Sequence, residues 1–391
     1  MFKEQVREIE QEVIGWRRDL HQIPELGNEL PQTSAYICGV LTELGIPFEK
    51  GIGIEFGILG EIDSGKPGKT VALRADMDAL KVIEETSLDF ASTNGCMHAC
   101  GHDGHSSILL GVAKILNENK DAFTGRVRLL FQPGEEIAAG AKPMVEAGVL
   151  EGVDYILGLH IGNISEELKP GMVMLSTGPM MACLDNFQMK VKGVGAHGAY
   201  PHQGIDPVVV TSHIIIGLQE IISRELNPVE PGVITIGQFT SGSAYNIIPD
   251  YAELQGTARA MTNETRQYLA RRIGEVAEGI ARGFRCEVEY NYNFAAPPVV
   301  NDEEVAHKVV ASARNIMNHE MVQYLKNPTM IGEDFSYYLE RVPGAFIFLG
   351  NPLPIDGVIY PHHNSKFALD EGEFKTGIEL LTQATVDLLN E

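Results

Sequence analysis

The chain has 391 residues, which is more than one compact core usually holds, so two domains are expected. Hydrophobic residues make up 44% of the chain and charged residues 21%, which is ordinary for a globular protein and excludes a disordered one. The 53 acidic against 30 basic residues give a formal net charge of -23, which argues against nucleic acid as a partner, because proteins that bind it carry a basic surface.

The start of the chain, MFKEQVREIEQEVIGWRRDL, is predicted to form a charged amphipathic helix. It is not expected to be a signal peptide, because no apolar core region follows it. No uninterrupted apolar run approaches the roughly 18 residues that a membrane-spanning helix needs, so no membrane partner is expected. We expect a cytoplasmic protein, and the five scattered cysteines fit reduced thiols there.

The first part of the chain alternates predicted strands and helices. Apolar, β-branched runs predict strands in KTVALRAD (69–76), RVRLLFQP (126–133) and YILGLHI (155–161). Helices are expected between them, in SSILLGVAKILNEN (106–119) and AAGAKPMVEAGVL (138–150). This alternation predicts an α/β domain with a mostly parallel sheet, in which chemistry gathers at the carboxyl ends of the strands.

The pattern changes over residues 186–297, where the expected order is strand, helix, strand, strand, helix, strand. This order predicts a ferredoxin-like unit inserted into the first domain. Its second helix, over 263–284, has apolar residues at spacings of three and four and buries one face. The catalytic, metal-bearing domain would then be discontinuous, comprising residues 1–185 and 298–391, with helices around the strand AFIFLG and an amphipathic C-terminal helix.

The densest group of metal-binding side chains lies in CMHACGHDGH, residues 96–105. Six potential ligands stand there between a strand and a helix: Cys96, His98, Cys100, His102, Asp103 and His105. A single glycine separates Cys100 from His102, so a tight loop can turn both toward one metal ion. A structural zinc site is the alternative, but it needs a closed set of sulfur and nitrogen ligands, and no Cys-x-x-Cys pair elsewhere completes one.

Two adjacent acids, Glu135 and Glu136, follow the strand RVRLLFQP. Adjacent carboxylates at a strand end repel each other unless cations or protons compensate them. A solvated helix start is the ordinary alternative, since acids favour the first helical turn. With a metal cluster in the same layer, we expect one glutamate to bind metal and its neighbour to transfer protons.

Further histidines stand where such a site needs them. His160 ends the strand YILGLH, and His362 and His363 lie in YPHHNSKF after the strand AFIFLG. Ligands that come from four separate segments are typical of a hydrolytic metal site. A thiolate with imidazoles favours zinc, nickel or cobalt over magnesium or calcium, and manganese remains open.

The inserted domain has its own markers. His197 lies in the glycine-flanked turn GVGAHGAYPH, where a core histidine is not expected. Asn246 of NIIPD and Arg259 of GTAR stand next to predicted strands. An arginine fork and an amide suit a substrate carboxylate, although an ordinary surface arginine is the alternative for Arg259.

These motifs run in order along nearly the whole chain, together with RRDLHQIPELG, LRADMDAL, FQPGEE, GIDP and GEDF. The combination resembles the metal-dependent aminoacylase family, which includes N-acyl-amino-acid amidohydrolases, hippurate hydrolases and auxin-conjugate hydrolases. The resemblance implies a dinuclear site in which Cys100 bridges two ions. It implies His102 and His160 on one ion, Glu136 and a late histidine on the other, and Glu135 as general base. It also implies that the inserted domain forms a homodimer and closes over the substrate as a lid.

The sequence departs from the family pattern in two places. Lys81 stands after LRADMDAL where the family usually has proline. The late metal histidine usually lies four residues before an aromatic residue, which selects His363 by counting back from Phe367 and leaves His362 as the alternative. Asp76 and Asp78 are expected to orient metal-binding histidines, without an assignment of either to one histidine.

The sequence therefore predicts a hydrolase that cleaves the amide bond of an N-acyl amino acid with the help of two divalent metal ions. Glu135 would move the proton from water to the leaving amine, and His197 would donate to the developing oxyanion. Asn246 and Arg259 would hold the free carboxylate of the substrate. A dipeptidase or other deacylase of the same larger group is the nearest alternative, and a non-catalytic protein that binds amino-acid conjugates is a more distant one.

Overall fold

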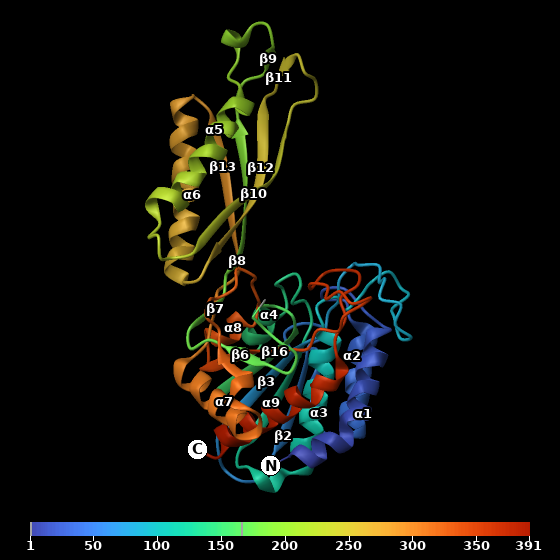
Figure 1. Cartoon of the computed structure of the whole chain (residues 1–391). Coiled ribbons are helices and arrows are strands. Elements are labelled where there is room, and N and C mark those ends of the chain that lie inside the picture. Colours follow the sequence, from blue (N-terminus) through green and yellow to red (C-terminus); the bar gives the residue numbers. More distant parts are fainter. Residues whose placement is uncertain (1, 166) are drawn as a thin grey trace. The chain divides into compact units, whose positions relative to one another are not determined.

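The computed structural model describes residues 2–165 and 167–391 and divides the chain into two compact units (Figure 1). Met1, where the expected first helix starts, and Glu166 lie outside the described residues. The larger unit comprises Met1–Met180, Val300–Asn327 and Asp334–Glu391, and the smaller one comprises Met181–Val299 and Pro328–Glu333. The smaller unit therefore includes a short late segment that the sequence pattern places in the larger domain.

An eight-stranded mixed sheet forms the centre of the larger unit. Its strands, in spatial order, are β1 (Phe48–Lys50), β2 (Ile58–Asp63), β4 (Arg126–Gln132), β3 (Thr70–Asp76), β5 (Tyr155–Gly162), β16 (Gly344–Gly350), β6 (Val173–Leu175) and β15 (Val322–Tyr324). The four central strands, β4, β3, β5 and β16, run parallel to one another. The expected α/β domain with a mostly parallel sheet is confirmed.

Seven described α-helices belong to this unit: α1 (Lys3–His21), α2 (Pro31–Glu43), α3 (His102–Glu118), α4 (Ala141–Glu146), α7 (Glu303–Ile316), α8 (Ser336–Leu339) and α9 (Phe374–Leu389). Helices α1, α3 and α9 contact one another and pack side by side (Figure 1). The helix expected over 138–150 is wrong in length, since α4 is much shorter. Ala138 and Gly148 both have left-handed backbone, with φ of 50° and 88°, which a right-handed helix cannot include.

The smaller unit has the order β8 (Leu184–Lys192), α5 (Pro207–Glu220), β10 (Gly232–Ser241), β12 (Tyr251–Ala260), α6 (Asn263–Gly283) and β13 (Glu287–Ala296). Its sheet order is β10-β12-β8-β13, and every neighbouring pair is antiparallel. This is the ferredoxin-like unit that the sequence predicts. Two very short strands, β9 (Ala196–His197) and β11 (Ile247–Ile248), form a separate ribbon, and β7 (Pro179–Met181) and β14 (Val299–Val300) form another.

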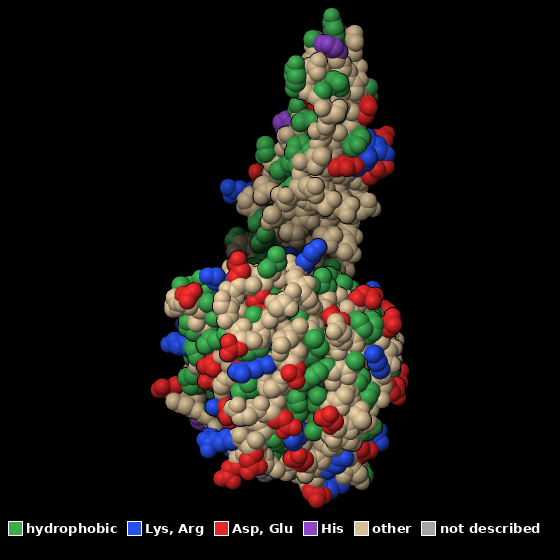
Figure 2. Space-filling view, turned by 90° about the vertical axis from the view of Figure 1, so that its right-hand side faces the viewer, with side chains coloured by type: hydrophobic (Ala, Val, Ile, Leu, Met, Phe, Trp, Pro, Cys, Tyr) green, Lys and Arg blue, Asp and Glu red, His purple; other side chains and the backbone are tan. Residues whose placement is uncertain are grey.

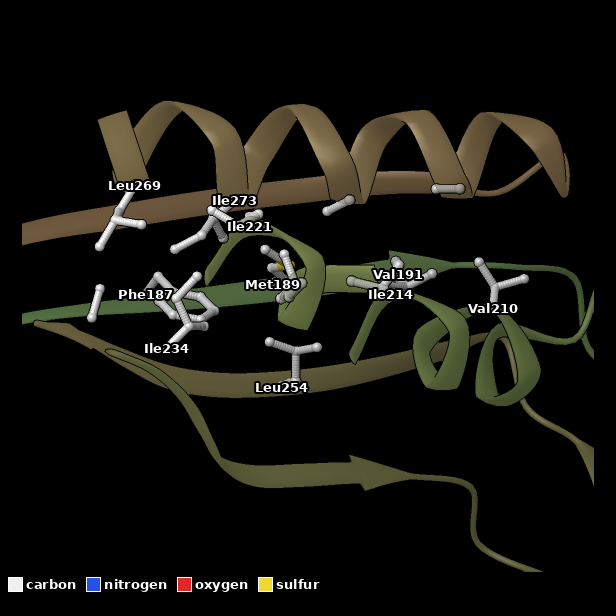
Figure 3. Close-up of a cluster of buried hydrophobic side chains, with 14 of the residues drawn as sticks. Phe187, Met189, Val191, Val210, Ile214, Ile221, Ile234, Leu254, Leu269 and Ile273 are labelled. Carbon is white, nitrogen blue, oxygen red and sulfur yellow. The ribbon is translucent and has the colours of Figure 1, made fainter. Parts of the chain in front are cut away.

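The core of the smaller unit lies between its sheet and its two helices (Figure 3). Phe187, Met189 and Val191 alternate along β8 and are almost fully buried. Leu269 and Ile273 of α6 approach them from the helix side (Figure 3). Burying one such side chain contributes about 1.5–3 kcal/mol, and this cluster gives the smaller unit a hydrophobic core of its own.

The surface of the larger unit carries acidic and basic side chains interspersed on the face that Figure 2 shows. Its net negative charge is thus spread out and forms no single acidic patch on that face. Among the described helices, none is both long and apolar enough to cross a lipid bilayer.

Candidate metal centre and active site

The carboxyl ends of three neighbouring parallel strands bring the predicted site residues together. Asp76 is the last residue of β3, Glu135 and Glu136 follow β4, and His160 lies near the end of β5. Since β4, β3 and β5 are adjacent and parallel, these side chains emerge at one edge of the sheet. This is the edge at which α/β sheets place their chemistry.

The loop before α3 adds Cys100 and His102 to this edge. Gly101 between them has φ of 89°, a left-handed backbone that glycine adopts without strain, and it caps the helix. The sulfur of Cys100, a ring nitrogen of His102 and a carboxylate oxygen of Glu136 all lie within 4.8 Å of one another. The expectation that one glycine turns both side chains to a common point therefore agrees with the geometry.

A tight turn after β4 positions the two glutamates. Gly134 has φ of 70°, a left-handed backbone that favours glycine, and a Cβ atom there would lie 2.0 Å from Oδ1 of Asn28 and displace that side chain. The backbone N–H groups of Glu135 and Glu136 donate to Oδ1 and Oδ2 of Asp78, each at 3.1 Å. One buried carboxylate thus holds the backbone of both acids.

His160 has the hydrogen-bonding pattern of a metal ligand. Its Nδ1 atom donates to the carbonyl oxygen of Ile161 at 3.0 Å, so its Nε2 atom keeps a lone pair. That Nε2 atom lies 3.6 Å from Sγ of Cys100. Burial lowers the pKa of His160 well below its usual value, which keeps the imidazole neutral. Metal-binding histidines commonly give their other ring proton to a carbonyl or carboxylate in this way.

His102 faces the carboxylates. Its Nδ1 atom lies 3.4 Å from Oδ1 of Asp78, which is ion-pair distance without the alignment of a hydrogen bond. Its Nε2 atom lies 3.7 Å from Oδ2 of Asp76 and 3.9 Å from Oε1 of Glu136. Asp78 therefore lies where it can orient His102, with the Nε2 atom directed to the cluster.

His105, the last histidine of the 96–105 cluster, has no lone pair to offer. Its Nδ1 atom donates to Oδ1 of Asp76 at 2.6 Å, and its Nε2 atom accepts from the backbone N–H of Ile161 at 3.0 Å. A neutral imidazole with both nitrogens engaged cannot also bind a cation. Asp76 therefore orients His105, which contacts the site without being one of the candidate ligands.

The two late histidines, His362 and His363, lie next to different candidate ligands. The backbone N–H of Asn163 donates to Nε2 of His362 at 3.3 Å, so the ring proton of His362 sits on Nδ1, which lies 3.7 Å from Sγ of Cys100. Burial lowers the pKa of His362 to about 3. The Nε2 atom of His363 lies 3.4 Å from Oε2 of Glu136. His362 can therefore donate its Nδ1 proton to the sulfur of Cys100. The Nε2 atom of His363 lies beside the carboxylate of Glu136 instead.

The charges of the cluster call for a cation. Burial raises the pKa of Asp76, but His102 and His105 outweigh it and hold the pKa well below 3.8. Burial lowers the pKa of His102, but Asp76 and the neighbouring carboxylates outweigh it and raise the pKa to about 10. Burial raises the pKa of Glu136 to about 7. The raised pKa values of His102 and Glu136 both reflect the carboxylates gathered around them, which a bound cation would compensate.

Buried polar atoms that lack a hydrogen-bond partner also indicate a cation at this site. Both ring nitrogens of His102 and the Oε1 atom of Glu136 are buried without a hydrogen-bond partner. Buried polar atoms without partners are rare in folded proteins, and an ion that binds them is one of the usual reasons. The thiol, imidazole and carboxylate donors present here therefore fit divalent metal ions.

The remaining predicted residues lie in the smaller unit. His197 in β9 pairs with Ile247 in β11, and Gly198 donates from its backbone N–H to the carbonyl oxygen of Asn246 at 2.8 Å. This ribbon makes His197 and Asn246 neighbours, and both are exposed. Ala199 donates to Nδ1 of His197 at 3.1 Å, so the ring proton of a neutral His197 is on Nε2 and available for donation.

Arg259 lies at the other end of the same unit. It stands eight positions after Tyr251, the first residue of β12, which corresponds to about 26 Å at roughly 3.3 Å per residue. Asn246 comes before Tyr251 in the chain, so it lies on the far side of Tyr251 from Arg259. Asn246 and Arg259 of one chain are therefore too far apart to hold the same carboxylate, because the extended strand β12 separates them.

The Arg259 guanidinium is half-buried among neutral acceptors. Its Nη1 atom donates to the carbonyl oxygens of Asp185 and Ala258 at 3.2 and 3.1 Å, and to the hydroxyl of Thr257. In the described part of the chain, no carboxylate lies at ion-pair distance from it. Burial lowers the pKa of Arg259, as expected for a cation whose charge is not matched.

Sequence reasoning missed a buried polar network behind the site, made by Arg74, Gln132 and Asp334. The signal was present, since a charged Arg74 stands within a largely apolar strand and Asp334 lies in the motif GEDF. A buried charge of this kind requires a partner. One partner, Asp76, is two positions away, but the other, Asp334, stands 260 positions later, which the spacing of the motifs alone does not indicate.

Comparisons with known proteins identify the family. A model described as peptidase family M20/M25/M40 matches residues 72–387. The "Thermostable carboxypeptidase 1" of Saccharolobus solfataricus is 43% identical over 386 residues, covering 96% of this chain and 95% of the relative. The "N-acyl-L-amino acid amidohydrolase" of Geobacillus stearothermophilus is 39% identical over 310 residues, covering 78% and 83%.

A solved structure agrees over nearly the whole chain. The YxeP protein of Bacillus subtilis, described as a dinuclear metal binding peptidase from the M20 family, aligns with a TM-score of 0.84 and 34% identity, covering 98% of this chain and 99% of that one. The resemblance to the amidohydrolases that the motifs indicate is thereby confirmed. The chain belongs to peptidase family M20/M25/M40, as a metal-dependent amidohydrolase.

Proposed function

We propose that this protein hydrolyses the amide bond of N-acyl amino acids and releases a carboxylic acid and a free amino acid. The observation that carries the proposal is the second glutamate beside the ligand set. Glu136 lies among the candidate ligands, while the adjacent Glu135 is held on the same carboxylate, Asp78, through its backbone. A binding protein needs ligands alone, whereas hydrolysis of an amide also needs a group that moves a proton.

Two divalent cations per chain would be held by Cys100, His102, Glu136, His160 and His363. Cys100 would be shared by the two cations, because its sulfur lies within 4.8 Å of candidate ligand atoms of His160 and of Glu136, which the resemblance assigns to different ions. Such donors suit zinc, manganese, nickel or cobalt. When bound, the cations supply positive charge that polarises the scissile carbonyl and acidifies water.

Glu135 would act as general base and then as general acid. It is 8% exposed, and its Oε2 atom lies 3.9 Å from Nε2 of His102, beside the ligand atoms. It takes a proton from the attacking water while the new C–O bond forms. It returns that proton to the amide nitrogen, so that the C–N bond breaks to give a neutral amine.

Arg259 would bind the free carboxylate of the amino-acid part, since its guanidinium has neutral acceptors and a fork suited to an anion. His197 would donate its Nε2 proton to the oxyanion that develops on the carbonyl. His197 and Asn246 lie about 26 Å or more from Arg259 within one chain, by the strand rise given above. We therefore propose that a second copy of the chain supplies His197 and Asn246.

Two features of the smaller unit support such a homodimer. Helix α5 carries two large apolar side chains at exposed positions, Val209 and Ile216, which are 49% and 69% exposed. Exposed apolar side chains of this kind can be covered by a partner. Strand β10 is an edge of the sheet, with unpaired backbone groups available for another strand.

A carboxypeptidase is the second candidate, because a carboxypeptidase is among the relatives that match over nearly the whole chain. The two substrates have the same amide and the same free α-carboxylate, and differ only in the group on the acyl side. A dipeptidase would cleave the same kind of amide bond, next to the same free carboxylate. The metal cluster and Arg259 serve all three alike, so the loops that receive the acyl side decide among them.

A substrate panel tests the proposal. The metal-loaded protein is assayed for release of free amine from N-acetyl and N-benzoyl amino acids, from dipeptides and from blocked longer peptides. We expect the N-acyl amino acids to be hydrolysed fastest and their carboxyl amides to react poorly, because the amides lack the charge that Arg259 recognises. Faster release from peptides would favour the carboxypeptidase, and release from none of these substrates would contradict amide hydrolysis.

A further inference from the structure

Asp334, in the GEDF motif, connects two strands and a helix behind the metal centre. Its Oδ1 atom accepts from Nη2 of Arg74 at 2.9 Å and from Nε2 of Gln132 at 2.8 Å. Its Oδ2 atom accepts from the backbone N–H of Ala141 at 3.0 Å. Arg74 belongs to β3, Gln132 is the last residue of β4, and Ala141 begins α4. One fully buried carboxylate therefore holds the carboxyl ends of two strands together.

Arg74 continues the network toward the ligands. Its Nη1 atom donates to Oδ2 of Asp76 at 2.8 Å, and its Nε atom donates to Oε1 of Gln132 at 2.9 Å. The Arg74 side chain is 1% exposed and those of Asp76 and Asp334 are fully buried. A guanidinium so buried is stable only when acceptors satisfy its fork, and removing one acid leaves an uncompensated charge.

Asp76 carries the network to the third strand. Its other oxygen, Oδ1, accepts from Nδ1 of His105, whose Nε2 atom accepts from the backbone N–H of Ile161 on β5. Ile161 directly follows His160. The His105 ring also stacks on His102, with centroids 5.3 Å apart. The chain of contacts from Asp334 thus reaches the backbone or ring beside two of the candidate ligands.

We propose that the Asp334 network, formed by Asp334, Arg74, Gln132, Asp76 and His105, positions the candidate metal ligands and sets the spacing between those that follow β4 and those on β5. Such positioning is needed because the same sheet edge gathers carboxylates that repel one another. Rigid support behind a metal site preorganises its ligands. The inference rests on the proposed cation sites and is independent of the substrate.

Two variants test this, Asp334→Asn and His105→Gln. Asn at 334 removes the charge that pairs with Arg74 and turns one acceptor into a donor. Gln at 105 removes the arm from Asp76 to β5 and the ring contact with His102, and leaves the Asp334–Arg74 pair in place. Each purified chain is stripped with a chelator and titrated with Co²⁺, following the thiolate-to-cobalt absorption band and the number of ions bound. We expect both variants to unfold cooperatively and to bind Co²⁺ about 10–100-fold more weakly than wild type.

Asp185→Asn is the matched control. Asp185 is a fully buried acid that pairs with Arg266 at 2.7 Å in the smaller unit, so its loss costs a comparable buried ion pair. It should lower the melting temperature and leave Co²⁺ affinity unchanged. Weakening of Co²⁺ binding in Asp185→Asn as large as in Asp334→Asn would overturn the inference, since the effect would then be general destabilisation.

The remaining outcomes are also decisive. Folded Asp334→Asn and His105→Gln chains with wild-type Co²⁺ affinity and an unchanged absorption band would refute the network's role alone. If Asp334→Asn does not fold, His105→Gln decides by the same criterion. A wild-type chain that binds no Co²⁺ would refute the proposed cation sites and this inference with them.

Discussion

A Glu135→Gln chain and a His197→Ala chain carry their changes in different units of the fold. Loss of a positioned general base costs about 10²–10⁴ in rate, and loss of an oxyanion donor costs about 10²–10³. Each variant alone should therefore be nearly inactive. If each site takes Glu135 from one chain and His197 from its partner, a dimer of the two variants has one site with both changes and one with neither.

The size of the effect follows from that arrangement. Equal amounts of the two variants give about half mixed dimers, and half of the sites in those are intact, so about a quarter of wild-type activity should return. Sites built within single chains would return nothing. The separation of about 26 Å between Arg259 and the His197 end of β12 is the structural reason to expect recovery, because one chain cannot bring both to one substrate.

A reciprocal mixture provides the control. A chain carrying both Glu135→Gln and His197→Ala, mixed equally with wild type, should leave only the wild-type dimers active, about a quarter of the sites. Sites within single chains would instead leave about half active. The assay is release of free amine from an N-acyl amino acid, with mixed dimers counted by two affinity tags. No recovery in the first mixture, despite confirmed mixed dimers, would refute the shared site.

The other predictions concern the metal centre. Chelation should abolish activity and a divalent metal should restore it, and activity in a protein shown by metal analysis to be empty would contradict the site. Cys100→Ser should weaken metal binding strongly while Cys38→Ser does not, and equal behaviour would exclude Cys100 as a ligand. The main effect of Glu136→Gln should be loss of bound metal, measured as metal content after dialysis. His363→Ala should lose bound metal, whereas His362→Ala should retain both ions and alter the cobalt–thiolate absorption band; the reverse would exchange their roles.

The fold class was accessible from the sequence because it depends on local periodicity. Apolar runs of the length of β3, β4 and β5 separated by helical patterns leave few alternatives to a mostly parallel sheet. The order of elements in the inserted unit likewise predicts its ferredoxin-like topology. The length of α4 was not accessible, since the backbone of Ala138 is set by the turn that positions the glutamates.

The chemical class of the site was also accessible, because motifs such as CMHACGHDGH and FQPGEE concentrate ligand types that seldom occur together by chance. The same motifs do not say which histidines offer a lone pair. His105 and His160 differ only in what their second nitrogen meets, and the partners that decide it come from β3 and β5.

Only the tertiary structure decided those roles. Asn163, about 200 positions before His362, sets the proton of that imidazole, and Asp334 reaches Arg74 across 260 positions. Strand β12 places Arg259 and Asn246 at opposite ends of one unit, although only 13 positions separate them in the chain (259 minus 246). Composition and periodicity act over a few residues, whereas tautomers, buried charges and distances across a strand are fixed by whichever distant segments fold against them.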